Sequence, residues 1–281
     1  MTRTVLALSQ HLSLEATCKT VDDVVAFADR LPAHTAVNIA WLDGQGSQDR
    51  AKVARSLAQS GLCPVPIIAA RRITSEAHLY DFTRRMREAG ARKHFMLVGG
   101  DPSKPQGPFP TGLDLLHSNW LEQDEIERVT LPGFPEGNPA APGDDNAVSL
   151  AVKAKALHQR NIVGEVTTQL ALNPKRILQW IQHLRGNDVA ALIRIGIPGP
   201  TPSGRIARYL KMFGIDDQDL ATATREQAGI LDFSPLLEEL YEGLASEPHG
   251  EVGLHLYPFG GTGPALDWLD RYEQPLLGLS A

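Results

Sequence analysis

The sequence is poor in cysteine, with only Cys18 and Cys63 among its 281 residues. Two distant cysteines form neither a disulfide framework nor a close metal-ligand pair, which is typical of a protein from a reducing compartment. The sequence also lacks any run approaching the roughly 20 apolar residues of a membrane span, and residues 1–10 do not resemble a signal peptide. We therefore expect a cytoplasmic protein that has no membrane partner.

An excess of basic residues is also absent. The formal net charge of −6 and the sequence pI near 5.8 provide no general electrostatic attraction to nucleic acid or anionic lipid. Small molecules are therefore the expected partners. Hydrophobic residues make up 42% of the chain, enough for a large core, and no linker or low-complexity segment divides it. We expect a single domain over residues 1–281.

The sequence does contain a regular alternation of short apolar runs and helical patterns. Ser75, for example, precedes an amphipathic pattern that continues through Leu79, Phe82 and Met86 to a stop at Gly90. Eight strand-like runs, each followed by a helical pattern, predict an α/β protein with a single (β/α)8 TIM barrel. The predicted strands are residues 12–16, 36–41, 63–69, 94–98, 128–131, 164–169, 190–195 and 252–257. The predicted helices are residues 21–30 capped by Thr20, 49–59, 75–90, 120–127, 146–159 and 174–184, more than one within 204–246, and one from 264.

The most informative stretch is residues 94–102, where an apolar run ends at Gly99, Gly100 and Asp101. Ligands of parallel α/β folds bind at the carboxyl ends of the strands, so Asp101 is a candidate functional residue. The alternative is a tight turn in which Asp101 only caps the next segment. Residues 102–112 form a proline- and glycine-rich loop longer than usual, and long loops at this position often cover a site.

Other functional side chains are expected at the ends of the predicted strands, and a barrel brings these ends to one face. They lack a central lysine for Schiff-base chemistry, a Ser-His-Asp set and a histidine cluster. Acid–base or hydride chemistry on an organic ligand therefore fits better. Besides Asp101, the candidates are Glu15, Trp41, Arg71, Glu136, Asn138, Gln169 and Tyr257.

Five short segments, in order along the chain, carry a resemblance to a known family. They are residues 12–15 with Glu15, residues 98–102 with Asp101, the loop 134–139, Thr168-Gln169, and residues 253–257. They resemble, respectively, the first strand with the catalytic glutamate, the Arg-Gly-Asp-Pro-like turn, the Tyr-Pro-Glu-x-His-Pro loop, the Thr-Gln pair and the last strand of the methylenetetrahydrofolate reductase family. The family match is weak in each segment but collinear across the barrel.

The resemblance implies reduction of 5,10-methylenetetrahydrofolate to 5-methyltetrahydrofolate with NADH or NADPH, usually with FAD. Glu15 would be the acid that protonates the departing nitrogen, and Asp101 would accept hydrogen bonds from the pterin. Gln169 would fix the pterin or the nicotinamide, and Tyr257 would also contact the substrate. The expected cofactor contacts are Trp41, Arg71, Gly100, Phe134, Glu136 and Asn138.

Five replacements put the flavin in doubt. Ala40, Ile67, Gly99, Phe134 and Asn138 stand where the family usually has threonine, histidine, arginine, tyrosine and histidine. Most of these changes remove a hydrogen-bond donor or a cation. We therefore expect FAD to bind weakly or not at all, with hydride passing directly from the nicotinamide to the folate.

Two other functions remain open at this point. A folate-binding methyltransferase would also use carboxylates on a pterin, and it would need no pyridine nucleotide. A barrel that keeps folate binding without catalysis would serve as a sensor or partner. The sequence leaves open the choice between NADH and NADPH, the direction of the reaction and the oligomeric state.

Overall fold

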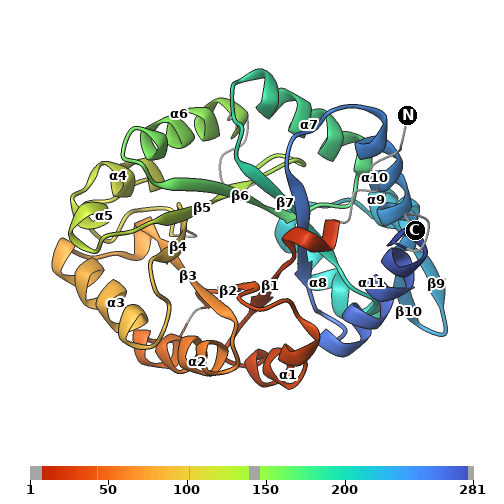
Figure 1. The fold of residues 1–281 in the computed structure, drawn as a ribbon, viewed down its shortest axis with the longest axis horizontal. Helices are drawn as coiled ribbons and strands as arrows, with labels where there is room; N and C mark the ends of the chain where they lie inside the picture. Colours follow the sequence, from red (N-terminus) through yellow and green to blue (C-terminus); the bar gives the residue numbers. More distant parts are fainter. Residues whose placement is uncertain (1–7, 43, 101, 139–145, 278–281) are drawn as a thin grey trace. The chain divides into compact units, whose positions relative to one another are not determined.

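The computed structural model describes residues 8–42, 44–100, 102–138 and 146–277. Eight strands form a closed barrel in the order β1, β2, β3, β4, β5, β6, β7 and β11 (Figure 1). This confirms the predicted (β/α)8 barrel. The barrel strands are β1 (Ser13–Ala16), β2 (Ala36–Ile39), β3 (Cys63–Ala69), β4 (His94–Val98), β5 (Arg128–Gly133), β6 (Val163–Leu170), β7 (Leu192–Pro198) and β11 (Val252–Tyr257).

The helices follow the strands in alternation. They are α1 (Val21–Ala26), α2 (Ser47–Gln59), α3 (Glu76–Glu88), α4 (Gly112–His117), α5 (Trp120–Gln123), α6 (Asn146–His158), α7 (Pro174–Gly186), α8 (Ser203–Phe213), α9 (Asp217–Ala223), α10 (Ser234–Ser246) and α11 (Thr262–Leu277). Within the described ranges, none of them is long and apolar enough to cross a membrane.

The chain forms two compact units. The β1–β5 unit contains Ser13–Pro132 and Leu150–Val166, and the β7–β11 unit contains Met1–Leu12, Gly133–Ser149 and Thr167–Ala281. The expectation of a single domain over residues 1–281 stays a prediction.

In the β1–β5 unit, helix α2 covers the outer side of β2 and β3, and α3 packs beside α2 (Figure 1). Helix α3 begins where the sequence indicated, because the Ser75 hydroxyl accepts a hydrogen bond from the His78 N–H at 3.1 Å. Its periodic side chains Leu79, Phe82 and Met86 are all buried, as predicted. The α3 pattern therefore gave both the start and the buried face of the helix.

In the β7–β11 unit, β7 and β11 run parallel, with Ile193 opposite Val252. The 3₁₀ helix η1 (Leu8–His11) lies against the amino ends of these two strands. A Cβ atom on Gly253 would lie 2.5 Å from the Cβ of His11, and Arg194 donates from Nε to the His11 carbonyl at 3.0 Å. Gly253 is therefore required by the close approach of η1.

One local prediction was wrong, and one small sheet was not predicted. The Thr20 hydroxyl does not cap α1 but accepts a hydrogen bond from the Thr17 N–H, whereas the helical stretch 21–30 is confirmed as α1 followed by the 3₁₀ helix η2 (Ala28–Arg30). The segment predicted to hold more than one helix contains α8, α9 and α10, and the unpredicted sheet consists of β8 (Thr201–Pro202), β10 (Ile230–Asp232) and β9 (Arg225–Gln227). Its strands are two or three residues long, and their turn places Ala228 and Gly229 at positive φ without an Asn-Gly signal.

Candidate active site

The predicted site residues belong to both units. Asp101 lies outside the described residues. In the β1–β5 unit are Glu15, Trp41, Arg71 and Gly100, and in the β7–β11 unit are Phe134, Glu136, Asn138, Gln169 and Tyr257.

Glu15 lies on β1 between two buried apolar neighbours, Leu14 and Ala16, and is itself partly buried. It stands opposite Asn38 of β2 in the strand register, so the two side chains project from the same face of the sheet. Asn38 is buried, and its Nδ2 approaches the Met96 sulfur at 3.4 Å. The register therefore places the Glu15 carboxyl group beside a buried amide.

Gly100 ends the turn after β4 in a conformation that requires glycine. Its φ is +94°, and a Cβ atom there would lie 3.1 Å from the Cβ of Ala69 at the end of β3. The glycine therefore serves the close approach of two strand ends, immediately before Asp101.

Arg71 fastens the long loop that follows β4. Its Nε donates to the Pro110 carbonyl at 3.0 Å and its Nη1 to the Pro102 carbonyl at 3.4 Å. The Gln106 N–H in turn donates to the Arg71 carbonyl at 2.8 Å. The structure therefore shows the Arg71 side chain binding the loop. A cofactor contact by Arg71 stays a prediction.

Trp41 packs against side chains of helices α2 and α3. Its ring stacks on Phe82 of α3 with centroids 5.6 Å apart, and the Arg50 guanidinium carbon lies 3.6 Å from the Trp41 ring centroid. The same guanidinium lies 4.3 Å from the Phe82 ring centroid. Trp41 is therefore held in a cluster of one cation and two aromatic rings.

Arg50 of this cluster is not among the predicted site residues, and it is only 1% exposed. Its Nη1 donates to the Ile67 carbonyl at 3.2 Å, while its Nε has no hydrogen-bond partner among the described residues. Burial lowers the pKa of Arg50 to about 9, and repulsion by Arg72 acts in the same direction. The sequence did carry a signal, because Arg50 lies on the helical face that also contains Val53 and Leu57.

Glu136 fastens the loop after β5 to the start of α7. Its Oε1 accepts hydrogen bonds from the Leu172 and Asn173 N–H groups at 2.7 and 2.9 Å. Its Oε2 pairs with Arg176 at 3.2 Å, and Arg176 also pairs with Asp219. A carboxylate is stabilised at a helix amino terminus, so the sequence-predicted cofactor residue has a clear structural role here.

Phe134 and Asn138 flank Glu136 in the same loop and are both partly buried. The Phe134 N–H donates to Oδ1 of Asn146, the first residue of α6, at 3.0 Å. The loop is thus fixed by the Glu136 carboxylate and by the Asn146 amide.

Gln169 and Tyr257 are brought together within the β7–β11 unit. Tyr257 is 7% exposed, and its hydroxyl donates to the Thr168 carbonyl at 3.4 Å, one residue before the partly buried Gln169. The Tyr257 ring crosses β7 at Gly196, where a Cβ atom would lie 2.9 Å from ring carbon Cε2. Tyr257 therefore contacts the residue next to Gln169, near the carboxyl ends of β6 and β11.

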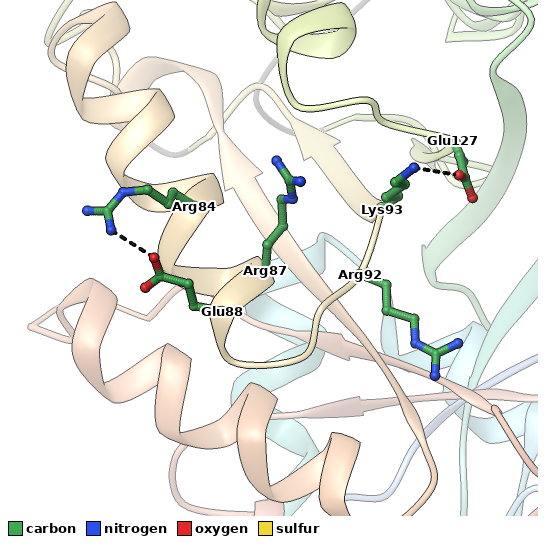
Figure 2. A pocket seen from close by; sticks show the side chains of 6 residues that line it. All are labelled: Arg84, Arg87, Glu88, Arg92, Lys93 and Glu127. Carbon is green, nitrogen blue, oxygen red and sulfur yellow. Dashed lines mark hydrogen bonds and ion pairs between the residues drawn. The ribbon is translucent and has the colours of Figure 1, made fainter.

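A cavity of about 640 Å³ lies in the β1–β5 unit near the amino ends of β4 and β5, not at the carboxyl ends where the site residues are predicted (Figure 2). Arg84 pairs with Glu88 and Lys93 with Glu127, both at 2.9 Å, and Arg87 pairs with Asp124 at 3.0 Å. Barrel enzymes carry their ligands at the carboxyl ends of the strands, whereas the amino ends serve stability. We therefore do not place the active site in this cavity.

Among the residues that the structure describes, no group of three His, Cys, Asp or Glu side chains could hold a metal ion. No family model matches the chain. One similar solved structure is a glycoside hydrolase family 18 chitinase of Flavobacterium johnsoniae, 10% identical, covering 94% of this chain and 94% of that one, with a TM-score of 0.50. The likeness supports the barrel fold alone.

Two further solved structures are more distant. A glycoside hydrolase family 20 β-N-acetylglucosaminidase is 10% identical over 95% of this chain and 67% of its own, with a TM-score of 0.44. A D-psicose 3-epimerase of Clostridium cellulolyticum is 12% identical over 95% of this chain and 98% of its own, with a TM-score of 0.34.

Proposed function

We propose that the protein is an oxidoreductase that interconverts 5,10-methylenetetrahydrofolate and 5-methyltetrahydrofolate with NADH or NADPH. The observation that carries the proposal is Glu15, a partly buried carboxyl group near the end of β1. The methylenetetrahydrofolate reductases that the sequence resembles have their catalytic acid on the first strand. The Gly100-Asp101 turn and Gln169 add support, because they match the folate-contacting positions of the same family.

The chemistry requires one proton and one hydride. Opening of the five-membered ring needs a proton on the departing nitrogen, which Glu15 would donate, leaving an iminium carbon. Hydride from the nicotinamide then forms the new C–H bond of the methyl group, and the nucleotide leaves oxidised. A proton from solvent restores Glu15 for the next turnover.

Recognition of the folate would fall to Asp101 and Gln169. A carboxylate at position 101 can accept hydrogen bonds from the amino and ring N–H groups of a pterin. The Gln169 carboxamide has both donors and an acceptor, so it can bind an amide edge of the pterin or the nicotinamide.

The contacts of three residues support a reaction without flavin. Ala40 is buried and its side chain has no hydrogen-bond donor, and Ile67 packs in an apolar cluster with Val65 and Met96. Arg71 uses Nε and Nη1 on the carbonyls of Pro110 and Pro102. Ala40 and Ile67 do not fit the polar edge of a flavin ring, which supports direct transfer of hydride from the nicotinamide to the folate.

The test is an anaerobic assay of the freshly purified protein with 5,10-methylenetetrahydrofolate and each pyridine nucleotide, together with its visible spectrum. We expect oxidation of NADH or NADPH that depends on folate and needs no added FAD. Folate binding without any nucleotide oxidation would contradict the reductase and favour a methyltransferase or a binding protein. Near-stoichiometric FAD in the spectrum would contradict direct transfer.

A further inference from the structure

The Thr168 hydroxyl links β6 and β7 beside Gln169. The Gly196 N–H of β7 donates to the Thr168 hydroxyl at 2.7 Å, and that hydroxyl donates to the Gln169 carbonyl at 2.9 Å. Just beyond the end of β6, the Ala171 N–H donates to the Gly196 carbonyl at 3.1 Å. The Thr168 hydroxyl therefore holds the backbone of Gln169 beside Gly196 of β7.

Tyr257 and Gly196 hold Thr168 in place. The Tyr257 hydroxyl binds the Thr168 carbonyl, and the Tyr257 ring occupies the space that a side chain on Gly196 would fill. A Cβ atom on Gly196 would also lie 2.4 Å from the Thr168 carbonyl oxygen. Position 196 must therefore be glycine for Tyr257 and β6 to keep these positions. Thr168 is only 1% exposed, so it cannot itself offer much surface to a ligand.

We propose that Thr168, Gly196 and Tyr257 are positioning residues that set the direction of the Gln169 side chain, so that Gln169 binds a planar ring with adjacent N–H and carbonyl groups. A backbone fixed at a strand position fixes the direction in which the side chain of that residue leaves the strand. The carboxamide of Gln169 matches such an edge only when its plane and direction are fixed. The ligand class rests on the proposed function, whereas the positioning role rests on the contacts above.

The first test is a double-mutant cycle on kcat/KM with 5,10-methylenetetrahydrofolate and NADH. Thr168→Val removes the hydroxyl at nearly constant shape, and Thr168→Ser retains it. We expect about a tenfold loss or more for Thr168→Val and less than about threefold for Thr168→Ser, since a lost buried hydrogen bond has this scale. In a Gln169→Ala background, Thr168→Val should cost less than about twofold further, because the two residues act as one unit. Equal losses in both backgrounds would overturn the positioning role.

The second test needs no turnover. In ¹⁵N-labelled protein, the side-chain amide resonances of Gln169, identified by their loss in Gln169→Glu, should shift in Thr168→Val and stay in place in Thr168→Ser. Tyr257→Phe, which removes only a hydroxyl, should shift them as well and serves if Thr168→Val does not fold. Unmoved resonances would overturn the inference. If the resonances respond as expected while wild-type protein oxidises neither nucleotide, the proposed function fails and the positioning role stands.

Discussion

The strand ends beside Arg71 and Trp41 and the surroundings of Gln169 are held in place by different means. In the β1–β5 unit, arginine side chains surround the strand ends: Arg71 binds two loop carbonyls, and Arg50 is buried against Trp41. Around Gln169 in the β7–β11 unit the contacts are neutral and close, made by the Thr168 hydroxyl and by Gly196. The β1–β5 strand ends are therefore held by charged side chains, whereas Gln169 is held by close packing of neutral groups.

This difference has consequences for substitution. A cation keeps part of its interaction when groups move by a fraction of an ångström, because Coulomb attraction falls slowly with distance. A close-packed contact has no such tolerance, since even one added methyl group must displace its neighbours. We therefore expect the β1–β5 unit to respond to changes of charge and the surroundings of Gln169 to respond to changes of volume.

The largest expected effect is that of Glu15→Gln, which removes a proton donor while keeping shape. Turnover should fall by about 100-fold or more, the usual scale for losing a general acid. Folate affinity should stay within a few-fold, because the amide still fills the position. Steady-state rates and calorimetric titration separate the two quantities, with Glu76→Gln at an exposed position of α3 as the control. Turnover near the wild-type value would remove Glu15 from the mechanism.

The next effect concerns shape alone. Gly196→Ala should lower the free energy of unfolding by about 1–3 kcal/mol, the usual cost of overpacking, because its Cβ meets the Thr168 carbonyl and the Tyr257 ring. Gly99→Ala is the matched control at a strand end of the other unit, since nothing lies within 4 Å of its added Cβ. We expect the control to change stability by less than about 0.5 kcal/mol. Urea denaturation measures both, and equal effects would break the contrast between the units.

Several elements could be predicted from the sequence to the residue. The runs that became β3, β4 and β11 are continuous, buried and ended by glycine, proline or charged residues, so their observed bounds equal the predicted ones. The small β8–β10–β9 sheet was missed because strands of two or three residues show no periodicity. The barrel therefore follows from local pattern, and its short insertions depend on tertiary contacts.

The candidate site was predicted less completely, for a physical reason. Strand ends give the places of Glu15 and Gln169, since topology alone decides them. The partners of Arg71 and Glu136 are backbone groups distant in sequence, and no local pattern announces them. A threonine before a glutamine likewise gives no sign that its hydroxyl binds a backbone N–H of the neighbouring strand.

A smaller effect is expected from Arg71→Met. Loss of the two hydrogen bonds should release the loop of residues 102–112, so that its amide hydrogens exchange about tenfold faster. The free energy of global unfolding should change by less than about 1 kcal/mol, since surface contacts contribute little to it. Arg71→Lys keeps the charge without the planar fork and should exchange at an intermediate rate. Mass spectrometry of the loop peptides measures the rates. Phe109 is buried, and Gly107 lies close to the Ile73 carbonyl, so unchanged exchange would show that these two residues hold the loop without Arg71.

The smallest expected effect at neutral pH is that of Arg50→Met. A buried cation costs desolvation, which its contacts with Trp41 and Phe82 offset, so an apolar side chain of similar length should change stability by less than about 1 kcal/mol.

The stability difference between the wild type and Arg50→Met should depend on pH. Because the folded-state pKa of Arg50 is lowered to about 9, the native protein releases this proton while the unfolded chain still holds it. The unfolded state then binds more protons, so the stability of the wild type relative to Arg50→Met should rise as pH increases through 9. Arg55→Met, at an exposed position of the same helix, should show no such rise in chemical denaturation between pH 7 and 10. If the stability difference between the wild type and Arg50→Met does not change with pH, the aromatic rings keep the Arg50 guanidinium charged. The charge then stabilises the β1–β5 strand ends by more than its desolvation destabilises them.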